Sequence, residues 1–235
     1  MVNPDYVFDK FISTTSNKFA RTTCLDFARS IQPPHNPIFL HGPTSVGKTH
    51  LLHAIARLDS SLRPYGRVLL VTAEEMMNEL NRDVATHLTR FREKYTNADL
   101  LLVDDIHILV GRKHTQQVFL DTFRKLIDNG GRLAMTSSKQ TADLSVFIDA
   151  IMRSMKCSLM IHIKPPSRHE IALLLARRFS ADGLQVQREL IKLATTCCTA
   201  SDIRRSEGLV KQMMFAASLG MRSSTGNEGS RNFSD

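Results

Sequence analysis

Residues 38–49 read IFLHGPTSVGKT, a short apolar run followed by a glycine-rich loop that ends in Lys48 and Thr49. Residues 42–49 fit the spacing G-x-x-x-x-G-K-[ST], and they lie between a predicted strand, Ile38–His41, and a predicted helix. Glycines let the backbone curl so that successive N–H groups point inward at an anion, and the helix N-terminus adds partial positive charge. The stretch therefore predicts a phosphate-binding loop.

The residues of this loop have separate expected roles in binding ATP and Mg²⁺. Lys48 is expected to neutralise β- and γ-phosphate oxygens, and the Thr49 hydroxyl is expected to hold Mg²⁺. The remaining contacts with the nucleotide are expected from Gly42, Thr44, Ser45, Val46 and Gly47. A chance match to this pattern occurs in roughly one chain of this length in a hundred, so the signal is specific.

Short apolar runs recur along the chain, and helical patterns separate them. The runs are continuous rather than alternating, which is typical of strands covered by helices on both faces. They are Ile38–His41, Val68–Thr72, Leu100–Asp104, 133–137 and 159–163. The main helical stretches between them are 50–58, 73–95 and 116–129. This order predicts an α/β fold with a parallel sheet.

The pattern changes at Pro165 and Pro166, and only helices are predicted beyond them. These helices are 167–180, 187–195 and 201–219, with Ser201 or Asp202 as N-cap of the third. Residues 220–235 are rich in glycine and serine, so we expect them to be disordered. The predicted divisions are 1–164 for the α/β core, 165–219 for a helical domain and 220–235 for a tail.

The composition is that of a soluble globular protein. Of 235 residues, 42% are hydrophobic and 23% are charged, and no run approaches the length of a membrane span. The first residues do not form a secretory signal, so we expect a cytosolic protein. The net charge of +8 permits contact with nucleic acid, but the basic residues are scattered, so charge alone does not establish it.

Cysteines and histidines give no metal-binding pattern. Cys24, Cys157, Cys197 and Cys198 form no C-x-x-C pair, so we expect reduced and mostly buried thiols. His50 and His53 lie three residues apart on a predicted helix, without further ligands at zinc-site spacing. We interpret them as residues of the helix surface.

A second chemical element follows the apolar strand Leu100–Asp104. A strand that ends in two acids brings a carboxylate to the edge of the sheet where phosphates bind. We assign Asp104 to the metal and Asp105 to polarising the attacking water, as the two catalytic residues. Aspartate is one methylene shorter than glutamate, so slow hydrolysis is expected. The alternative is an acidic strand end that faces solvent.

Two further elements are weaker. The strand 133–137 is followed by Ser138, which is a candidate sensor of the γ-phosphate or an ordinary strand end. Arg204, near the start of the third helix of the helical domain, is a candidate phosphate ligand that would couple domain angle to nucleotide state. Its alternative is an ordinary exposed arginine beside Arg205.

Several segments together resemble the AAA+ domain of the bacterial DnaA replication initiators. The resemblance covers about residues 3–219, nearly the whole chain, and its motifs occur in the family's order. The segments are NPDYVFDKF (3–11), NPIFLHG (36–42), GKTHLLHAI (47–55), FREKY (91–95) ahead of 100–106, Pro165-Pro166, and the helix with Arg204, Glu207 and Gly208.

The resemblance implies a five-stranded αβα AAA+ core with a helical lid. It also implies ATP-dependent assembly with like subunits on origin DNA, with single-stranded DNA inside the assembly. By position, Leu80 and the cluster Arg112, Lys113 and His114 would face that strand. Arg204 would be the arginine of the lid that contacts the nucleotide.

The sequence also departs from the family pattern. Where the family has arginines before the last core strand, including a finger that reaches a neighbour's ATP, this chain has Ala150 and Ser154, with Arg153 adjacent. Ser138 stands where the family usually has aspartate, and His114 stands at the basic pore position. The family continues into a helix-turn-helix domain that the present sequence does not show, so sequence-specific duplex binding is not expected of it.

Three functions remain open on these residues. The first is an initiator module that binds ATP, assembles and engages origin DNA, with weak ATPase activity. The second is a DnaA-related regulatory protein that binds the initiator and alters its ATP hydrolysis. The third is a helicase loader, a function that would require a helicase-binding extension ahead of Phe8.

Overall fold

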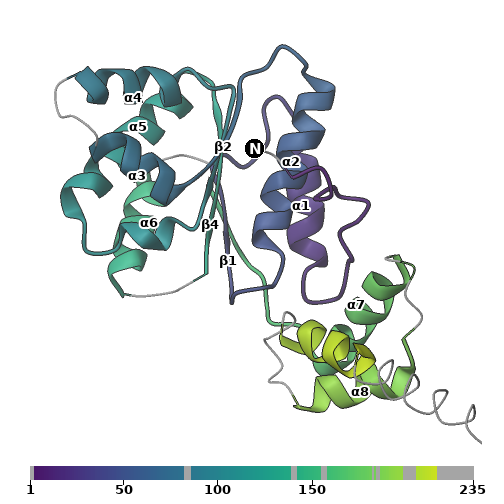
Figure 1. Ribbon diagram of the computed structural model, residues 1–235. Coiled ribbons are helices and arrows are strands. Elements are labelled where there is room, and N and C mark those ends of the chain that lie inside the picture. The colour runs from purple at the N-terminus through teal and green to yellow at the C-terminus, as the bar shows by residue number, and fades with distance from the viewer. Residues whose placement is uncertain are drawn as a thin grey trace, which may run out of the picture. The chain divides into compact units, whose positions relative to one another are not determined.

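The computed structural model describes residues 3–81, 86–138, 142–154, 158–181, 183, 186–197 and 205–215. The chain divides into two compact units, Met1–Pro165 and Pro166–Asp235. The first unit carries the sheet, and the second is helical (Figure 1). The division falls three residues after the last strand ends.

The sheet of the first unit has five strands, all paired in parallel, in the order β2-β3-β4-β1-β5. Their bounds are β1 Ile38–His41, β2 Val68–Thr72, β3 Leu100–Asp104, β4 Arg132–Ser137 and β5 Leu159–His162. Strand β4 lies between β1 and β3, with Leu40 opposite Thr136 and Val103 opposite Met135. The carboxyl ends of β1, β3 and β4 therefore meet at one edge of the sheet.

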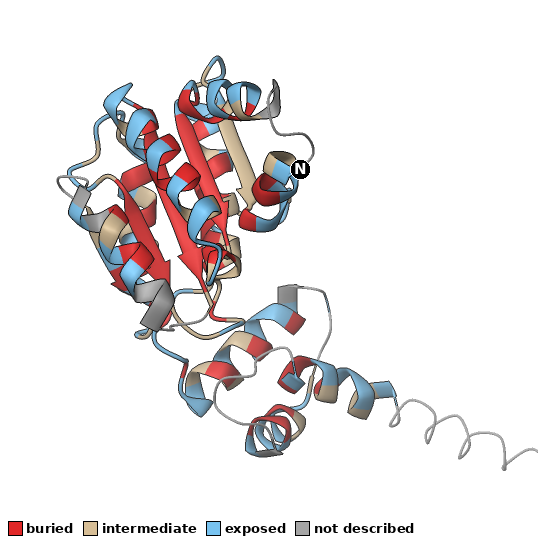
Figure 2. Cartoon of the chain, turned by 90° about the vertical axis from the view of Figure 1, so that its left-hand side faces the viewer, coloured by how far each residue is buried: buried red, intermediate tan, exposed pale blue. Residues whose placement is uncertain are grey.

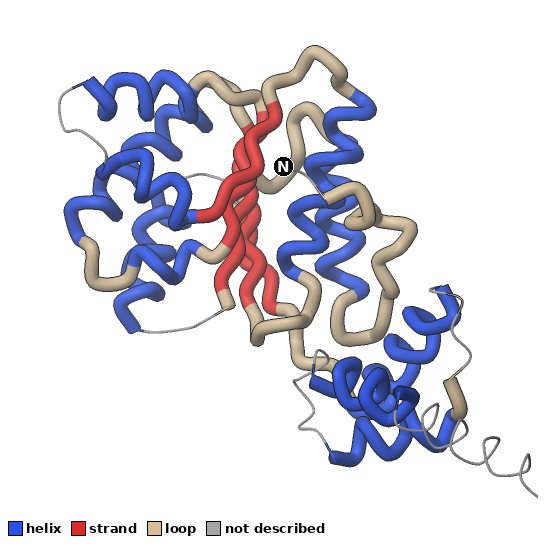
Figure 3. Tube along the Cα trace, in the orientation of Figure 1, coloured by secondary structure: helices blue, strands red, loops and turns tan. Residues whose placement is uncertain are grey.

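Helices cover both faces of this sheet (Figures 1 and 3). On one face lie α1 (Lys18–Arg29) and α2 (Lys48–Leu62), which pack on Leu100 and Leu102 of β3. The other face packs through Leu101 and Val103. Its helices are α3 (Ala73–Asn81), α4 (Thr86–Thr96), η1 (Ile106–Leu109), α5 (Lys113–Asp128) and α6 (Ala142–Ser154).

Burial explains why the strands appear as continuous apolar runs. Every residue of β1, β3 and β4 is buried, because helices cover both sides of these central strands (Figure 2). The edge strand β2 is half-buried along its whole length, and β5 exposes Met160 and His162. The predicted parallel sheet is confirmed, and the strands match the predicted runs within one residue at each end.

The helices differ more from prediction. Helix α2 begins at Lys48, two residues before the predicted start, because the last two residues of the phosphate-loop motif belong to its first turn. The single predicted stretch 73–95 contains two helices, α3 and α4, and residues 82–85 lie outside the described residues. Helices α1 and α6 were not predicted.

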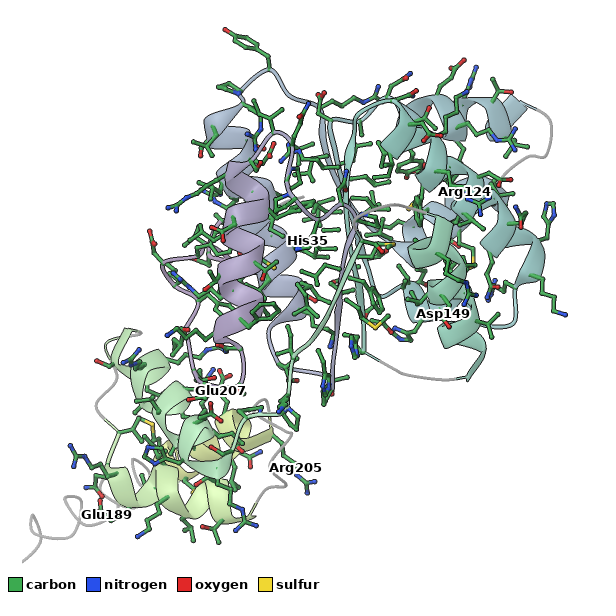
Figure 4. All side chains as sticks on the ribbon, turned by 180° about the vertical axis from the view of Figure 1, so that it is seen from behind. His35, Arg124, Asp149, Glu189, Arg205 and Glu207 are labelled. Carbon is green, nitrogen blue, oxygen red and sulfur yellow. The ribbon has the colours of Figure 1, made fainter. Side chains whose placement is uncertain are left out.

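The second unit contains α7 (Arg168–Ala181), α8 (Arg188–Cys197) and helical residues 205–215. Its core is small and apolar, and it consists of Ile171, Leu175, Phe179, Ile191, Ala194 and Val210. Glu207, labelled in Figure 4, forms ion pairs with Arg178 at 3.0 Å and with Lys211 at 2.9 Å. Ser201, Asp202, Arg204 and the tail 220–235 lie outside the described residues.

Candidate functional site

The loop after β1 has the backbone geometry that its glycines predict. Gly47 has φ +97°, and a Cβ atom at this position would lie 2.7 Å from Cε2 of Phe11. A Cβ at Gly42 would lie 2.3 Å from the carbonyl oxygen of Ile163. Ser45 also has a positive φ, +66°, so the chain curls tightly before α2 begins. Only glycine fits both close approaches, which fixes the curl of the loop.

Lys48 lies inside this curl. Its residue is only 5% exposed, and Nζ donates hydrogen bonds to the carbonyl oxygens of Gly42 at 2.8 Å and Pro43 at 2.6 Å. A buried ammonium group held by carbonyls at the start of a helix makes a strongly positive site. Phosphate oxygens are acceptors of the right charge for this site.

A hydroxyl and a carboxylate lie together beside the loop. Thr49 Oγ1 donates to Asp104 Oδ2 at 2.7 Å, which joins the first turn of α2 to the end of β3. Thr136 Oγ1 donates to Asp104 Oδ1, and it accepts a hydrogen bond from the backbone N–H of Asp105 at 3.0 Å. Asp104 is a buried residue, 8% exposed, and its carboxylate is held by two hydroxyl groups.

These oxygens suit a hard cation such as Mg²⁺. Carboxylate and hydroxyl oxygens are hard ligands, and Mg²⁺ is usually held by one or two protein groups together with water and phosphate oxygens. Within the described ranges, no cluster of three His, Cys, Asp or Glu side chains could hold a metal by itself. Thr49 and Asp104 are thus the residues that would hold Mg²⁺ next to a bound triphosphate.

The backbone of Asp105 is in a strained conformation, and its carboxylate is contacted by neighbouring side chains. Its φ is +56°, in the left-handed region that non-glycine residues rarely adopt. Its Oδ1 accepts a hydrogen bond from Ser138 Oγ at 2.9 Å and lies 3.5 Å from Nδ1 of His107. Its side chain remains 40% exposed, so the carboxylate can reach solvent at the same edge of the sheet.

The N-terminal segment packs onto helix α2, a feature that sequence patterns missed. The Tyr6 ring stacks on His50 with centroids 4.7 Å apart, and His50 Nε2 lies 2.9 Å from the carbonyl oxygen of Val7. The backbone N–H of Asn3 donates to Nδ1 of His53 at 2.9 Å. Burial lowers the pKa of His53. The two histidines are hydrogen-bonded anchors for this segment rather than residues of an open helix surface.

A second histidine pair lies at the carboxyl ends of β1 and β5. The rings of His41 and His162 stack with centroids 4.8 Å apart. Burial lowers the pKa of His41, and the nearby His162 and Lys48 lower it further. The electrostatic environment of the loop therefore disfavours additional positive charge on β1.

Other residues singled out in the sequence lie away from this cluster or cannot be placed. Leu80 is half-buried against the core under α3 to α6, whereas Arg112, Lys113 and His114 are exposed at the start of α5. Cys24 is buried, and burial raises the pKa of its thiol. Arg204, Cys157, Cys198 and the side chain of Cys197 lie outside the described residues.

The positions expected for a finger lie on α6. The Arg153 side chain is 73% exposed, and its Nη1 lies 3.8 Å from Asp149 Oδ2, one turn earlier and labelled in Figure 4. Ala150 packs against the core, and the side chain of Ser154 lies outside the described residues. Arg153 is thus directed to solvent and is paired weakly.

The strand order and the loop geometry define a P-loop protein with the AAA+ fold. Over residues 2–162, the chain matches the family model of the bacterial DnaA ATPase domain. It is 32% identical over 221 residues to the chromosomal replication initiator protein DnaA of Lachnoclostridium phytofermentans, covering 93% of this chain and 49% of that protein. The chain belongs to the bacterial DnaA family, and the resemblance inferred from its motifs is confirmed.

Solved structures agree with this family. Domain III of the Thermotoga maritima replication initiation protein DnaA has a TM-score of 0.81 and 28% identity, covering 94% of this chain and 92% of that chain. A replication initiator DnaA solved with AMPPCP and single-stranded DNA has a TM-score of 0.78 and 22% identity, covering 97% and 70%, which supports the fold alone. The chain spans about half the length of the curated relatives it matches. Among the helices in the described ranges, we find no candidate for a membrane span.

Proposed function

We propose that this chain is the ATP- and Mg²⁺-binding switch module of a DnaA-like replication initiator. The observation that carries the proposal is the joint placement of Lys48, Thr49 and Asp104 at one edge of the sheet. Lys48 Nζ lies within the glycine loop, and the Thr49 hydroxyl lies 2.7 Å from the Asp104 carboxylate. Binding of a triphosphate with Mg²⁺ needs a cationic side chain for the phosphates, here Lys48. It also needs oxygen ligands for the metal ion, here from Thr49 and Asp104.

Each residue has a defined part in binding. Backbone amides of the loop, with Gly42, Thr44, Ser45, Val46 and Gly47, contact the phosphates, and Lys48 exchanges its carbonyl partners for phosphate oxygens. Thr49 and Asp104 hold Mg²⁺, which neutralises phosphate charge when bound. Arg204 is proposed as a further phosphate contact from the second unit.

Hydrolysis is proposed to be slow. Asp105 orients the attacking water through its carboxylate, which is 40% exposed and next to the Asp104 site. Its Oδ1 is already engaged by Ser138 Oγ at 2.9 Å. A carboxylate one methylene shorter than that of glutamate is a weak activator of water, and slow hydrolysis suits a switch that acts in its ATP-bound state.

The proposed partners are further subunits of the same type and single-stranded origin DNA. The charge of +8 and the exposed Arg112, Lys113 and His114 at the start of α5 support contact with a phosphate backbone. Such contact is expected to weaken steeply as salt rises. We propose that this role is carried out in the cytosol.

A second function is favoured by one observation on α6. The chain has Ala150 and Ser154 at the positions expected for the finger, and the arginine next to them, Arg153, is exposed. A nucleotide site without a finger fits a regulatory relative that binds the initiator and alters the initiator's ATP hydrolysis.

One experiment separates the two functions. ATP affinity and hydrolysis are measured for the chain alone, with single-stranded DNA, and with a full-length DnaA initiator. ATP-dependent oligomers on single strands support the initiator module, whereas faster hydrolysis by the initiator without strand binding supports the regulator. An absence of ATP binding under all three conditions contradicts both.

A further inference from the structure

His107 lies beside the carboxylate of Asp105 and belongs neither to the phosphate loop nor to the acid pair. It follows the acid pair in the 3₁₀ helix η1, and its side chain is 16% exposed. Its Nδ1 is buried and has no hydrogen-bond partner among the described residues. It lies 3.5 Å from Oδ1 of Asp105.

The backbone of Asp105 leaves its carboxylate little freedom. The residue is fixed at φ +56°, and its N–H donates to Thr136 Oγ1 at 3.0 Å. The carboxylate can therefore adjust only by rotating its side chain. A water held by Asp105 is oriented well only if one carboxylate oxygen is anchored while the other faces the water.

Ser138 supplies that anchor in the present structure, through its hydroxyl at 2.9 Å from Oδ1. A serine hydroxyl has one hydrogen, so it donates either to Asp105 or to another acceptor. A γ-phosphate in the proposed site is such an acceptor for a residue at the end of β4. When Ser138 turns to phosphate, Asp105 Oδ1 loses its donor.

His107 lies where it can replace the Ser138 hydroxyl as the hydrogen-bond donor to Asp105 Oδ1. An approach of about 0.5 Å would bring Nδ1 within normal hydrogen-bond distance of Oδ1. We propose that His107 is a positioning residue for Asp105, whose Nδ1–H holds Oδ1 when the Ser138 hydroxyl contacts the triphosphate. This role rests on the proposed function, since it requires ATP to be bound and hydrolysed.

Three substitutions separate positioning from packing. In His107→Asn, the amide nitrogen falls near the place of Nδ1; in His107→Gln it falls near Nε2, and His107→Leu has no donor. We expect the Leu and Gln variants to lose about tenfold in turnover, the effect of one hydrogen bond to a charged group, while Asn recovers most of it. ATP affinity is expected to stay at the wild-type value, and exposed His35→Leu serves as a control for loss of an imidazole.

A nuclear magnetic resonance measurement tests the contact without turnover. In ¹⁵N-labelled chain with Mg²⁺ and a non-hydrolysable ATP analogue, we expect the Nδ1–H tautomer of His107, and its signal should shift in Asp105→Asn. An unprotonated Nδ1, or a signal insensitive to Asp105→Asn, overturns the proposal.

The turnover measurements distinguish failure of the His107 positioning role from failure of the proposed function. Equal turnover in all His107 variants, or equal losses in Asn and Leu, overturns the positioning role while leaving the proposed function intact. A wild-type chain that binds ATP without any turnover contradicts proposed hydrolysis, and with it the role of His107 in the reaction.

Discussion

The hydroxyl of Thr49 donates to the carboxylate of Asp104 over 2.7 Å, although the two residues are 55 positions apart in sequence. The contact joins the first turn of α2 to the end of β3, with β4 lying between β3 and β1 in the sheet. It exists because parallel strands place their carboxyl ends at one edge, where α2 also begins. A phosphate loop and a metal ligand from distant segments thereby form one site.

Removing the hydroxyl from this pair should affect binding only when Mg²⁺ is present. Thr49→Val keeps the shape of the side chain but lacks the oxygen. We expect ATP affinity to fall about tenfold with Mg²⁺, as one ligand is lost, and to change little in EDTA. Isothermal titration under the two conditions measures this, with exposed Thr196→Val as control. Equal losses in both conditions would show that Thr49 does not act through the metal.

Lys48 should be required for nucleotide binding itself. Lys48→Ala removes the buried cation that lies 2.8 Å from the Gly42 carbonyl oxygen. We expect ATP affinity to fall at least about a hundredfold, because phosphate charge is then left uncompensated in a partly buried site. Lys125→Ala, at an exposed position of α5, is the matched control. If Lys48→Ala binds ATP as well as wild type, the phosphate-loop assignment fails.

The sequence predicted the parts of this molecule that local patterns encode. The strand Leu100–Asp104 is recognised because burial on both faces requires a continuous apolar run. The loop is recognised because Gly42 and Gly47 occupy positions where a side chain would collide with Ile163 and Phe11. Both signals are contained in a few consecutive residues.

Contacts between distant segments carry no such signal. A histidine after an acid pair has no distinctive sequence pattern, and the proximity of His107 to Asp105 depends on the left-handed backbone at Asp105. The packing of Tyr6 on His50 likewise depends on how the N-terminal segment returns to α2.

A buried ion-pair network at the amino end of β4 should be important for stability. Asp59 is fully buried, and it accepts hydrogen bonds from Arg63 and from Arg132, the latter at 2.5 Å. Burial lowers the pKa of Arg132, and Asp59 opposes this. Asp59→Asn leaves the arginines uncompensated, so we expect a loss of about 3 kcal/mol in the free energy of unfolding. Urea denaturation measures it against Asp26→Asn, an exposed position on α1, and a loss no larger than this control's would contradict the network's importance.

Arg153 should matter only in an assembly. Its side chain is 73% exposed, so Arg153→Ala is expected to leave ATP affinity of the isolated chain unchanged. If Arg153 acts as a finger toward a neighbour's ATP, turnover that depends on assembly should fall by at least about a hundredfold. The measurement is ATP hydrolysis as a function of protein concentration. Unchanged concentration dependence would assign Arg153 to the solvent surface.

Stability should depend on pH through His41. Burial, together with the neighbouring His162 and Lys48, lowers the pKa of His41 in the folded chain below its ordinary value of 6.5. Between the folded and unfolded pKa values the unfolded chain binds more protons, so the free energy of unfolding decreases as pH falls below about 6.5. The stabilising contribution of neutral His41 is fully present above that pH.

The test compares the unfolding midpoints of wild type and His41→Gln from about pH 7.5 to pH 5.5, the range in which an ordinary histidine titrates. Glutamine keeps a polar side chain at the end of β1 but cannot gain a proton, so its midpoint should fall less steeply with acid. Exposed His35→Gln corrects for loss of an imidazole as such. Carboxylates titrate alike in all three proteins, so the difference between the curves isolates His41. If the wild-type and His41→Gln curves run parallel, the burial of His41 next to Lys48 does not govern its protonation.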